Sequence, residues 1–485
     1  MLKAILGGRG ARVLAALATA TAGSAALAQG QTGGSVVQPP APVQIVQQGS
    51  SSANYRGSAT TQKLVNGVLP LSLDDAIALG LKHNLGLILT QQNGLSAHGQ
   101  ELSRLQALLP AVDAKVTAAV QQTDLQAQGL RISGFPVIIG PYGYTDIRGS
   151  VKWSLLDLSG LQNYLAAKHD FAGAKLSMED ARNLVVLTVG NAYLTCIADK
   201  SRIETEQAQV ATSKVSLDQA VQNHEAGVSP LLDELRARVD YQSQQQALIT
   251  AQNAYDKDRL ALARVIGLPL EQKFKLTTET PYTPLDSLDP DAAVKEALAL
   301  RNDLKAMKEQ LAAAEHARKA ATDERLPVIG FSGDYGDIGV NPSNSHGTGN
   351  ASGTLDVPLF EEGKLRGDAQ QAQAQLDQMR ARLSDLEGQI SADVRDSILD
   401  IQAAEKQVEV ARSNVNLAKE ALTEAQERYK AGVADNLEVS EALGALAQAT
   451  DRYVNSLYEH NLAKLSLARA LGVAGNNYKM YVGGK

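Results

Sequence analysis

The sequence predicts an α+β protein in which long paired helices and four β-strands occur as one unit written twice. Three observations predict this class. The segments 226–267 and 431–472 align without gaps at an offset of 205, with ten of 42 positions identical. No proline occurs between Pro141 and Pro230 or after Pro358, as expected for the interiors of long helices. Four segments alternate apolar and polar side chains, which is typical of half-buried strands.

Composition narrows the possible functions. Only 4% of the 485 residues are aromatic, which favours long helices packed side by side over a dense globular core. The net charge of −7 argues against a nucleic-acid partner, because no excess of Lys and Arg is present to neutralise phosphates. The single cysteine excludes an intrachain disulfide framework and a Cys-based zinc site.

The first residues are typical of an export signal. Lys3, Arg9 and Arg12 give a basic start, an apolar stretch covers 13–22, and 26–28 reads Ala-Leu-Ala, as at a signal-peptidase site. The apolar stretch is shorter than the roughly 20 residues that a membrane-spanning helix needs. We therefore expect residues 1–28 to be a cleaved signal peptide.

The remaining chain divides into two repeats with short flanking segments. Residues 29–70 are rich in Gln, Gly, Ser and Pro, a composition that predicts a flexible leader. Each repeat is expected to run in the order helix, β-hairpin, long helix, Ala-Gly-Val turn, long helix. The expected boundaries are a first repeat at 71–270 with its turn at 226–228, a connector at 271–287, a second repeat at 288–475 with its turn at 431–433, and a short tail at 476–485.

The longest helices carry a heptad pattern. Apolar residues recur every seven positions from Ile401 to Tyr429, and alanines follow the first four of them by three. This is an a/d seam in which alanine lets two helices approach closely. Residues 159–225 would span about 100 Å as one helix, so we expect helical hairpins too long for a compact domain. Cys196 lies 205 residues before Ile401 and is expected to be a packed, unreactive thiol in the matching seam.

Strand alternation predicts one β-hairpin in each repeat, at 111–158 and at 327–360. The turn-rich segments 140–143 and 341–349 are the expected loops of these hairpins. Two interpretations remain open at this point, a soluble half-buried sheet or a lipid-facing barrel wall with a polar lumen. The side chains that we expect to face lipid in the second case are Val116, Trp153, Phe331, Tyr335 and Val357.

The number of strands restricts the interpretation as a lipid-facing barrel wall. Four strands cannot close a membrane barrel, because the smallest closed barrels have eight, and open sheet edges are not tolerated in hydrocarbon. If these strands cross a membrane, several copies of the chain must share one barrel.

The two repeats contain several short motifs, namely 71–79 (LSLDDAIAL), 109–110 (LP), 153–160 (WSLLDLSG), 301–304 (RNDL), 325–327 (RLP) and the two Ala-Gly-Val turns. On these motifs the chain resembles the TolC-type outer-membrane efflux protein family, over about residues 71–475. In the second repeat, Asn302 replaces the proline that the family often has in its Arg-Pro-Asp-Leu motif. Without a cysteine near the expected cleavage site, the chain is closer to the unlipidated type.

This resemblance implies a tandem-duplicated TolC-like fold and a homotrimer. Four strands per chain would form a 12-stranded barrel in the outer membrane, and the helical hairpins a periplasmic α-barrel. The implied function is a passive duct for efflux or type I secretion, which receives substrates from an inner-membrane pump or ABC transporter through a periplasmic adaptor.

No enzymatic or cofactor motif is found. The seven histidines show no HExxH spacing, and the chain contains no GxxxxGK[ST] phosphate loop and no GxSxG elbow. We therefore expect no catalytic residues, no metal and no cofactor, with energy supplied by a partner.

Acidic residues follow both Ala-Gly-Val turns. Glu438 and Glu441 are three residues apart and hence share a helix face, and Asp233 occupies the position in the first repeat that matches Glu438. The resemblance implies that such residues line a periplasmic constriction, where three chains would form carboxylate rings that attract cations. The alternative is ordinary first-turn acids, which the helix dipole favours.

Two other functional classes compete with the duct. A periplasmic adaptor would also carry a helical hairpin, but adaptors have one hairpin between lipoyl-like halves, whereas this chain has two hairpins and paired strands. A structural coiled-coil stalk would lack the duplicated β-hairpins.

Overall fold

A computed structural model describes residues 54–59, 64, 66–127, 129, 133–278, 282–285, 288–341, 343–434 and 436–482. All of them fall within 48–485, one unit of the fold. The expected signal peptide at 1–28 lies outside the described residues, as does most of the expected leader.

Each repeat begins with two shorter helices, and a side chain caps the first turn of three of these four helices. Ser72 and Asp75 form a capping box at the first helix, and Asn84 caps the second. In the second repeat Asp289 caps a helix that has Pro290 at its first position. These helices are α3 (Leu73–His83), α4 (Leu85–Gln106), α7 (Pro290–Leu300) and α8 (Asn302–Asp323).

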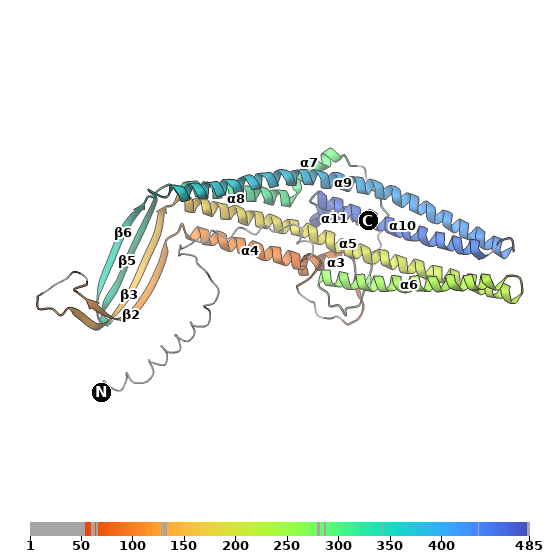
Figure 1. Cartoon of the computed structure of the whole chain (residues 1–485), viewed down its shortest axis with the longest axis horizontal. Helices are drawn as coiled ribbons and strands as arrows, with labels where there is room; N and C mark the ends of the chain where they lie inside the picture. The colour runs from red at the N-terminus through yellow and green to blue at the C-terminus, as the bar shows by residue number, and fades with distance from the viewer. Residues whose placement is uncertain are drawn as a thin grey trace, which may run out of the picture. The chain divides into compact units, whose positions relative to one another are not determined.

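Two very long helices dominate the described chain. They are α5 (Leu158–Glu225, 68 residues) and α9 (Glu362–Lys430, 69 residues), which confirms the predicted length. Each folds back through a tight turn into the next helix, α6 (Leu231–Ile266) or α10 (Asn436–Ala470), and the chain ends in α11 (Ala474–Val482). In Figure 1 the two hairpin turns lie at one end of these helices and the large sheet at the other.

The predicted heptad seam is buried. Ile401 and Val408 of α9 are 5% and 2% exposed, and the alanines at 404, 411 and 425 are buried beside them. Cys196 of α5 is fully buried, and this burial raises its pKa to about 12. The thiol is therefore protonated and packed, as predicted.

The main sheet has the order β2-β3-β5-β6, with all neighbours antiparallel. Its strands are β2 (Ala111–Asp124), β3 (Ile138–Leu156), β5 (Val328–Asn341) and β6 (Asn344–Asp356). Each repeat contributes one hairpin, and β3 pairs with β5 to join the two repeats. Edge strands β2 and β6 therefore belong to different repeats.

The first predicted hairpin loop was wrong, and the second, at 341–349, was too long, because β5 ends at Asn341 and β6 begins at Asn344. Residues 140–143 lie inside β3, where Gly140–Pro141 is a cis peptide, and 344–349 lie inside β6. Glycine and asparagine favour turns locally, but pairing with neighbouring strands overrides that preference. Val357 lies one residue beyond β6, and Pro358, which follows it, has no N–H to extend the pairing.

Segments expected to lie outside the repeats also take part in the fold. Leu69–Leu71, which begins in the expected leader, forms β1 and pairs in parallel with β4 (Phe274–Leu276) from the expected connector. Tyr55 is buried, and its carbonyl accepts a hydrogen bond from Asn84 Nδ2 at 2.6 Å. Residues 474–482, which include most of the expected short tail at 476–485, form α11. These pairings join segments far apart in sequence, so local composition does not report them.

Candidate functional site

The four-stranded sheet has one apolar and one polar face. Its register aligns Val116 with Ile147 and Trp153 with Phe331, and side chains two residues apart along a strand share a face. The apolar face includes Val112, Val116, Val120, Ile147, Val151, Trp153, Ile329, Phe331, Tyr335, Ala351 and Leu355, and the same register also places the charged Asp337 on it, opposite Ile147. Val116 and Tyr335 on this face are 69% and 71% exposed in the single chain. The chain itself therefore does not cover this apolar face.

Glycines allow aromatic side chains to cover the apolar face near β6. A Cβ on Gly347 would lie 2.5 Å from the Tyr335 hydroxyl, and one on Gly349 would lie 3.0 Å from the Tyr335 ring. The Tyr335 side chain therefore occupies space that side chains at 347 and 349 would fill.

Polar contacts tie three strands together on the opposite face. Arg148 of β3 donates to Asp146 at 3.3 Å, to Thr348 of β6 at 2.9 Å, and also to Asp334 of β5. Ser332 and Ser352 share a hydrogen bond of 2.8 Å between β5 and β6. This face can contact water, whereas the apolar face cannot do so without cost.

Four of the five predicted lipid-facing residues share the apolar face. Val116, Trp153, Phe331 and Tyr335 lie there by register. The fifth, Val357, falls after the end of β6 and has no place in that register.

The two Ala-Gly-Val turns have the same backbone geometry. Gly227 and Gly432 have φ values of +71° and +72°, a left-handed conformation that favours glycine. The next N–H donates back to the helix, from Val228 to Asn223 at 2.8 Å and from Val433 to Arg428 at 3.1 Å. These are Schellman caps, and the repeated motif is thus the signal that ends each long helix.

The three predicted acidic residues are not equivalent. Glu441 is exposed, whereas Glu438 is half-buried and pairs with Arg428 of α9 at 3.1 Å. Asp233 is buried, and its carbonyl accepts a hydrogen bond from Asn436 of the other tip at 3.4 Å. Glu438 and Glu441 remain on one side of α10, but Asp233 lies between the two hairpins.

The partners that brace these tips were not predicted from the sequence. His224 pairs with Glu234 at 2.9 Å across the first turn, just as Arg428 pairs with Glu438 across the second. Ser440 donates to Asp240 at 2.5 Å and joins the two hairpins. The spacing in the sequence could have indicated these pairs, because in each one a basic residue stands ten positions before an acidic residue, with the Ala-Gly-Val turn between them.

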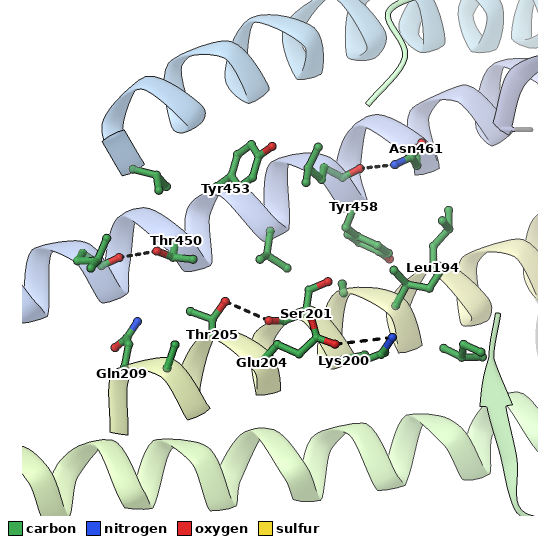
Figure 2. A pocket seen from close by; sticks show the side chains of 18 of the residues that line it. Leu194, Lys200, Ser201, Glu204, Thr205, Gln209, Thr450, Tyr453, Tyr458 and Asn461 are labelled. Atoms are coloured by element: carbon green, nitrogen blue, oxygen red, sulfur yellow. Dashed lines mark hydrogen bonds and ion pairs between the residues drawn. The ribbon is translucent and has the colours of Figure 1, made fainter. Parts of the chain in front are cut away.

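A groove of about 690 Å³ lies between α5 and α10 (Figure 2). Lys200 and Glu204 form an ion pair of 3.7 Å along it. Thr205 and Thr450 instead donate to carbonyls of their own helices, at 3.0 and 2.8 Å. Several polar side chains of the groove are thus satisfied within one helix, whereas the buried amide of Gln209 has no hydrogen-bond partner among the described residues.

A family model described as outer membrane efflux protein matches residues 101–268 and 293–473, which together are most of the chain. The chain belongs to the outer membrane efflux protein family. The two matched segments correspond to the two repeats.

Curated relatives in this family are outer-membrane proteins of efflux pumps. The chain is 23% identical over 423 residues to the probable efflux pump outer membrane protein TtgC of Pseudomonas putida, covering 83% of both chains. It is 24% identical over 457 residues to the outer membrane protein OprJ of Pseudomonas aeruginosa, covering 90% of this chain and 91% of OprJ.

Solved structures show the same TolC-like fold. The Campylobacter jejuni CmeC outer membrane channel aligns with a TM-score of 0.75 at 16% identity, covering 89% of this chain and 93% of CmeC. VceC from Vibrio cholerae aligns with a TM-score of 0.72 at 20% identity, covering 82% of this chain and 96% of VceC. The α+β duplicated architecture predicted from the sequence is thereby confirmed.

The outer membrane efflux protein family is a family of channels, not of enzymes. Within the described ranges, no three His, Cys, Asp or Glu side chains are placed to hold a metal ion. The described residues form a two-faced sheet, long helical seams and charged tips.

Proposed function

We propose that three copies of this chain form a passive export duct, with a 12-stranded barrel in the outer membrane. The two-faced sheet carries this proposal. Its edge strands β2 and β6, of 14 and 13 residues, offer rows of backbone groups for pairing. Hydrocarbon does not tolerate open sheet edges, and four strands from each of three copies close one barrel.

In this barrel the apolar face of the sheet meets lipid. Val116, Phe331 and Tyr335 contact acyl chains, and Trp153 lies toward the periplasmic end, beside the start of α5. Arg148 and its partners then line the lumen, where water solvates their charges.

The helices continue the barrel as a tube through the periplasm. Inside one chain, Ala306, Ala313 and Ala320 of α8 are buried and seven residues apart, and α8 packs against α5. By the duplication, α4 matches α8 and α9 matches α5. Three exposed leucines in or just after α4 are also seven residues apart, namely Leu95, Leu102 and Leu109. We therefore expect α4 to pack against α9 of the next copy.

Energy and cargo come from partners. Relatives are named as outer-membrane proteins of efflux pumps, which supports a role downstream of an inner-membrane transporter and a periplasmic adaptor. Residues 1–28 direct export across the inner membrane before they are cleaved.

The hairpin tips form the periplasmic mouth. Three copies of Glu438 and Glu441 form carboxylate rings whose summed potential draws cations toward the aperture. Asp233 contributes less, because its side chain is buried between the hairpins.

Two measurements test the proposal. The full chain should sediment with outer membranes as a heat-modifiable trimer on gels, and recovery as a soluble periplasmic monomer would refute the duct. In planar bilayers, Glu438→Gln with Glu441→Gln should lower cation selectivity, while Glu459→Gln on the same helix, far from the turn, should not. Unchanged selectivity in the double variant would remove these residues from the mouth but leave the barrel intact.

A further inference from the structure

Two histidines from different repeats meet between α5 and α8. The rings of His169 and His316 lie with centroids 5.3 Å apart and planes inclined by only 13°. Both side chains are half-buried in the seam that joins the first repeat to the second.

Each histidine is held by the helix opposite. His169 Nδ1 lies 2.7 Å from Glu309 of α8, and His316 Nδ1 lies 2.7 Å from Gln162 Oε1 of α5. Glu309 precedes His316 by seven residues, and Gln162 precedes His169 by seven, so the two contacts are related by a local two-fold axis. Carboxylate and amide oxygens only accept hydrogen bonds, so both Nδ1 atoms donate.

This arrangement suits neutral or singly charged rings. A proton added at Nε2 of His169 is balanced by the Glu309 carboxylate. A proton added to His316 faces only the neutral Gln162 amide and the neighbouring ring. Two charged rings at this separation repel each other, and the repulsion acts directly across the α5–α8 seam.

Other charged groups surround the pair. Asp170 lies beside His169 on α5, and Glu315 and Lys319 flank His316 on α8. Arg380 of α9 lies 3.9 Å from Glu315, and the His98–Glu101 pair of α4 lies on the other side of α5. Burial, then His169 and Lys319, lower the pKa of His316, while Glu315 acts in the opposite sense.

The seam has few other polar contacts to replace the histidines. One turn from His169, a Cβ on Gly173 would lie 3.3 Å from the Ala306 carbonyl, so the two backbones approach closely there. Ala313 is buried in the same seam. Small side chains allow close packing but form no hydrogen bonds between the helices. The histidine pair therefore provides the polar contact of the α5–α8 seam.

We propose that His169 and His316 form a pH-responsive clamp between the two repeats, closed at neutral pH and opened when the second ring becomes charged. The inference is independent of the proposed export function, since it concerns one seam inside a single chain.

The direction of the pH effect follows from the folded-state pKa. Because the pKa of His316 is lower in the folded chain, its neutral form stabilises the seam above the unfolded value of about 6.5. That stability is lost as the pH falls below this value. Asp170 acts oppositely, because desolvation raises its pKa to about 6 and its protonation in acid relieves that cost.

Hydrogen exchange on the full-length protein in detergent tests the clamp. Protection factors, corrected for intrinsic exchange, should fall about tenfold in 162–173 and 309–320 between pH 7.5 and 5.5. Unchanged protection of the unaltered protein in both segments would overturn the proposal. Asp170→Asn, which removes the opposing group, should leave the fall in place or enlarge it.

Variants assign the effect to the two rings. His169→Asn with His316→Asn keeps a donor near each Nδ1 position but cannot acquire charge, so its protection should not fall over the same range, and Asp170 should instead raise it as the pH falls. His98→Asn, which alters a histidine of the α4–α5 seam, should keep the pH dependence of the unaltered protein. A double variant that retains the full pH dependence would exclude the histidines as its source.

Discussion

Arg428 of α9 and Glu438 of α10 form an ion pair of 3.1 Å across the second hairpin turn. It spans the Ala-Gly-Val cap and joins the end of one helix to the beginning of the next. The first hairpin has a counterpart in His224 and Glu234, which lie 2.9 Å apart and pair an imidazole, not a guanidinium, with the carboxylate. The two tips are thus braced by different chemistry.

Removing Arg428 should loosen the second tip without unfolding the chain. Both partners are nearly half exposed, so the pair contributes at most about 1 kcal/mol. Arg428→Gln should leave trimer yield unchanged, but free the Glu438 carboxylate and raise cation selectivity in planar-bilayer recordings. Arg412→Gln is the matched control, because Arg412 is an exposed arginine of α9 that lies 16 residues before Arg428, farther from the turn. Equal selectivity of both variants would contradict a role for Arg428 at the mouth.

The two faces of β5 should respond differently to a charge. Phe331→Arg places a cation on the lipid-facing side, at a cost of about 2–4 kcal/mol near the membrane midplane and less near its surface. Ser332→Arg places the same cation on the polar side. Outer-membrane fractions should contain far less heat-modifiable trimer for the first variant than for the second. Equal yields would mean that the sheet faces lipid with its other side.

Gly336 should not tolerate a methyl group. A Cβ at this position would lie 2.4 Å from the Ile147 carbonyl oxygen and 2.6 Å from Arg148 Cα. Gly336→Ala should therefore force β3 and β5 apart, at a cost of about 1–3 kcal/mol, and lower the temperature at which the trimer dissociates. Gly353→Ala is the control, because no atom lies within 4 Å of its Cβ position. Identical dissociation temperatures would show that the strands adjust freely.

Arg301 should be the most sensitive charged residue outside the barrel. It is 5% exposed and donates to Asp303 at 2.6 Å and to Asp393 at 3.0 Å. Arg301→Met leaves these carboxylates without their cationic partner and should lower the free energy of unfolding by about 3–5 kcal/mol. Arg395→Met breaks the exposed pair with Asp291 and should cost less than about 1 kcal/mol.

The Arg301 effect should also depend on pH. Burial alone would raise the pKa of Asp303, but hydrogen bonds and charge from Arg301 lower it below the ordinary value. The pair therefore stabilises the fold above about pH 4 and loses this contribution as the pH falls further. The difference in dissociation temperature between Arg301→Met and the unaltered protein should shrink in acid. A difference that stays constant below pH 4 would place the effect in packing alone.

Sequence patterns predicted the long helices well, because their signals are local and repeated. Pro-free stretches and a sustained heptad leave few alternatives to paired helices. The strand ends were less predictable. Gly339 and Asn344 have turn preferences, yet they lie in strands because neighbouring backbones pair there. Likewise, β1 and β4 come from segments about 200 residues apart, so neither segment alone indicates the pairing.

At the tips, the sequence located the acidic residues but not their environments. The duplication aligned Asp233 with Glu438, yet one is buried between hairpins and the other is braced by Arg428. Burial here depends on how the two hairpins pack, which the alignment of one repeat on the other does not contain.

The duplication makes the α5–α8 seam and the proposed α9–α4 seam between neighbouring copies quasi-equivalent. α5 matches α9 at the offset of 205, whereas α4 (85–106) matches α8 (302–323) at an offset of 217. His169 thus corresponds to Ala374 and His316 to Gly99, so the clamp has no counterpart in the second kind of seam. In a ring of three chains, seams that contain the histidine pair would alternate with seams that contain no histidine at the matching positions. Acid would then distort such a ring with threefold symmetry, by hinging within each subunit and not between subunits.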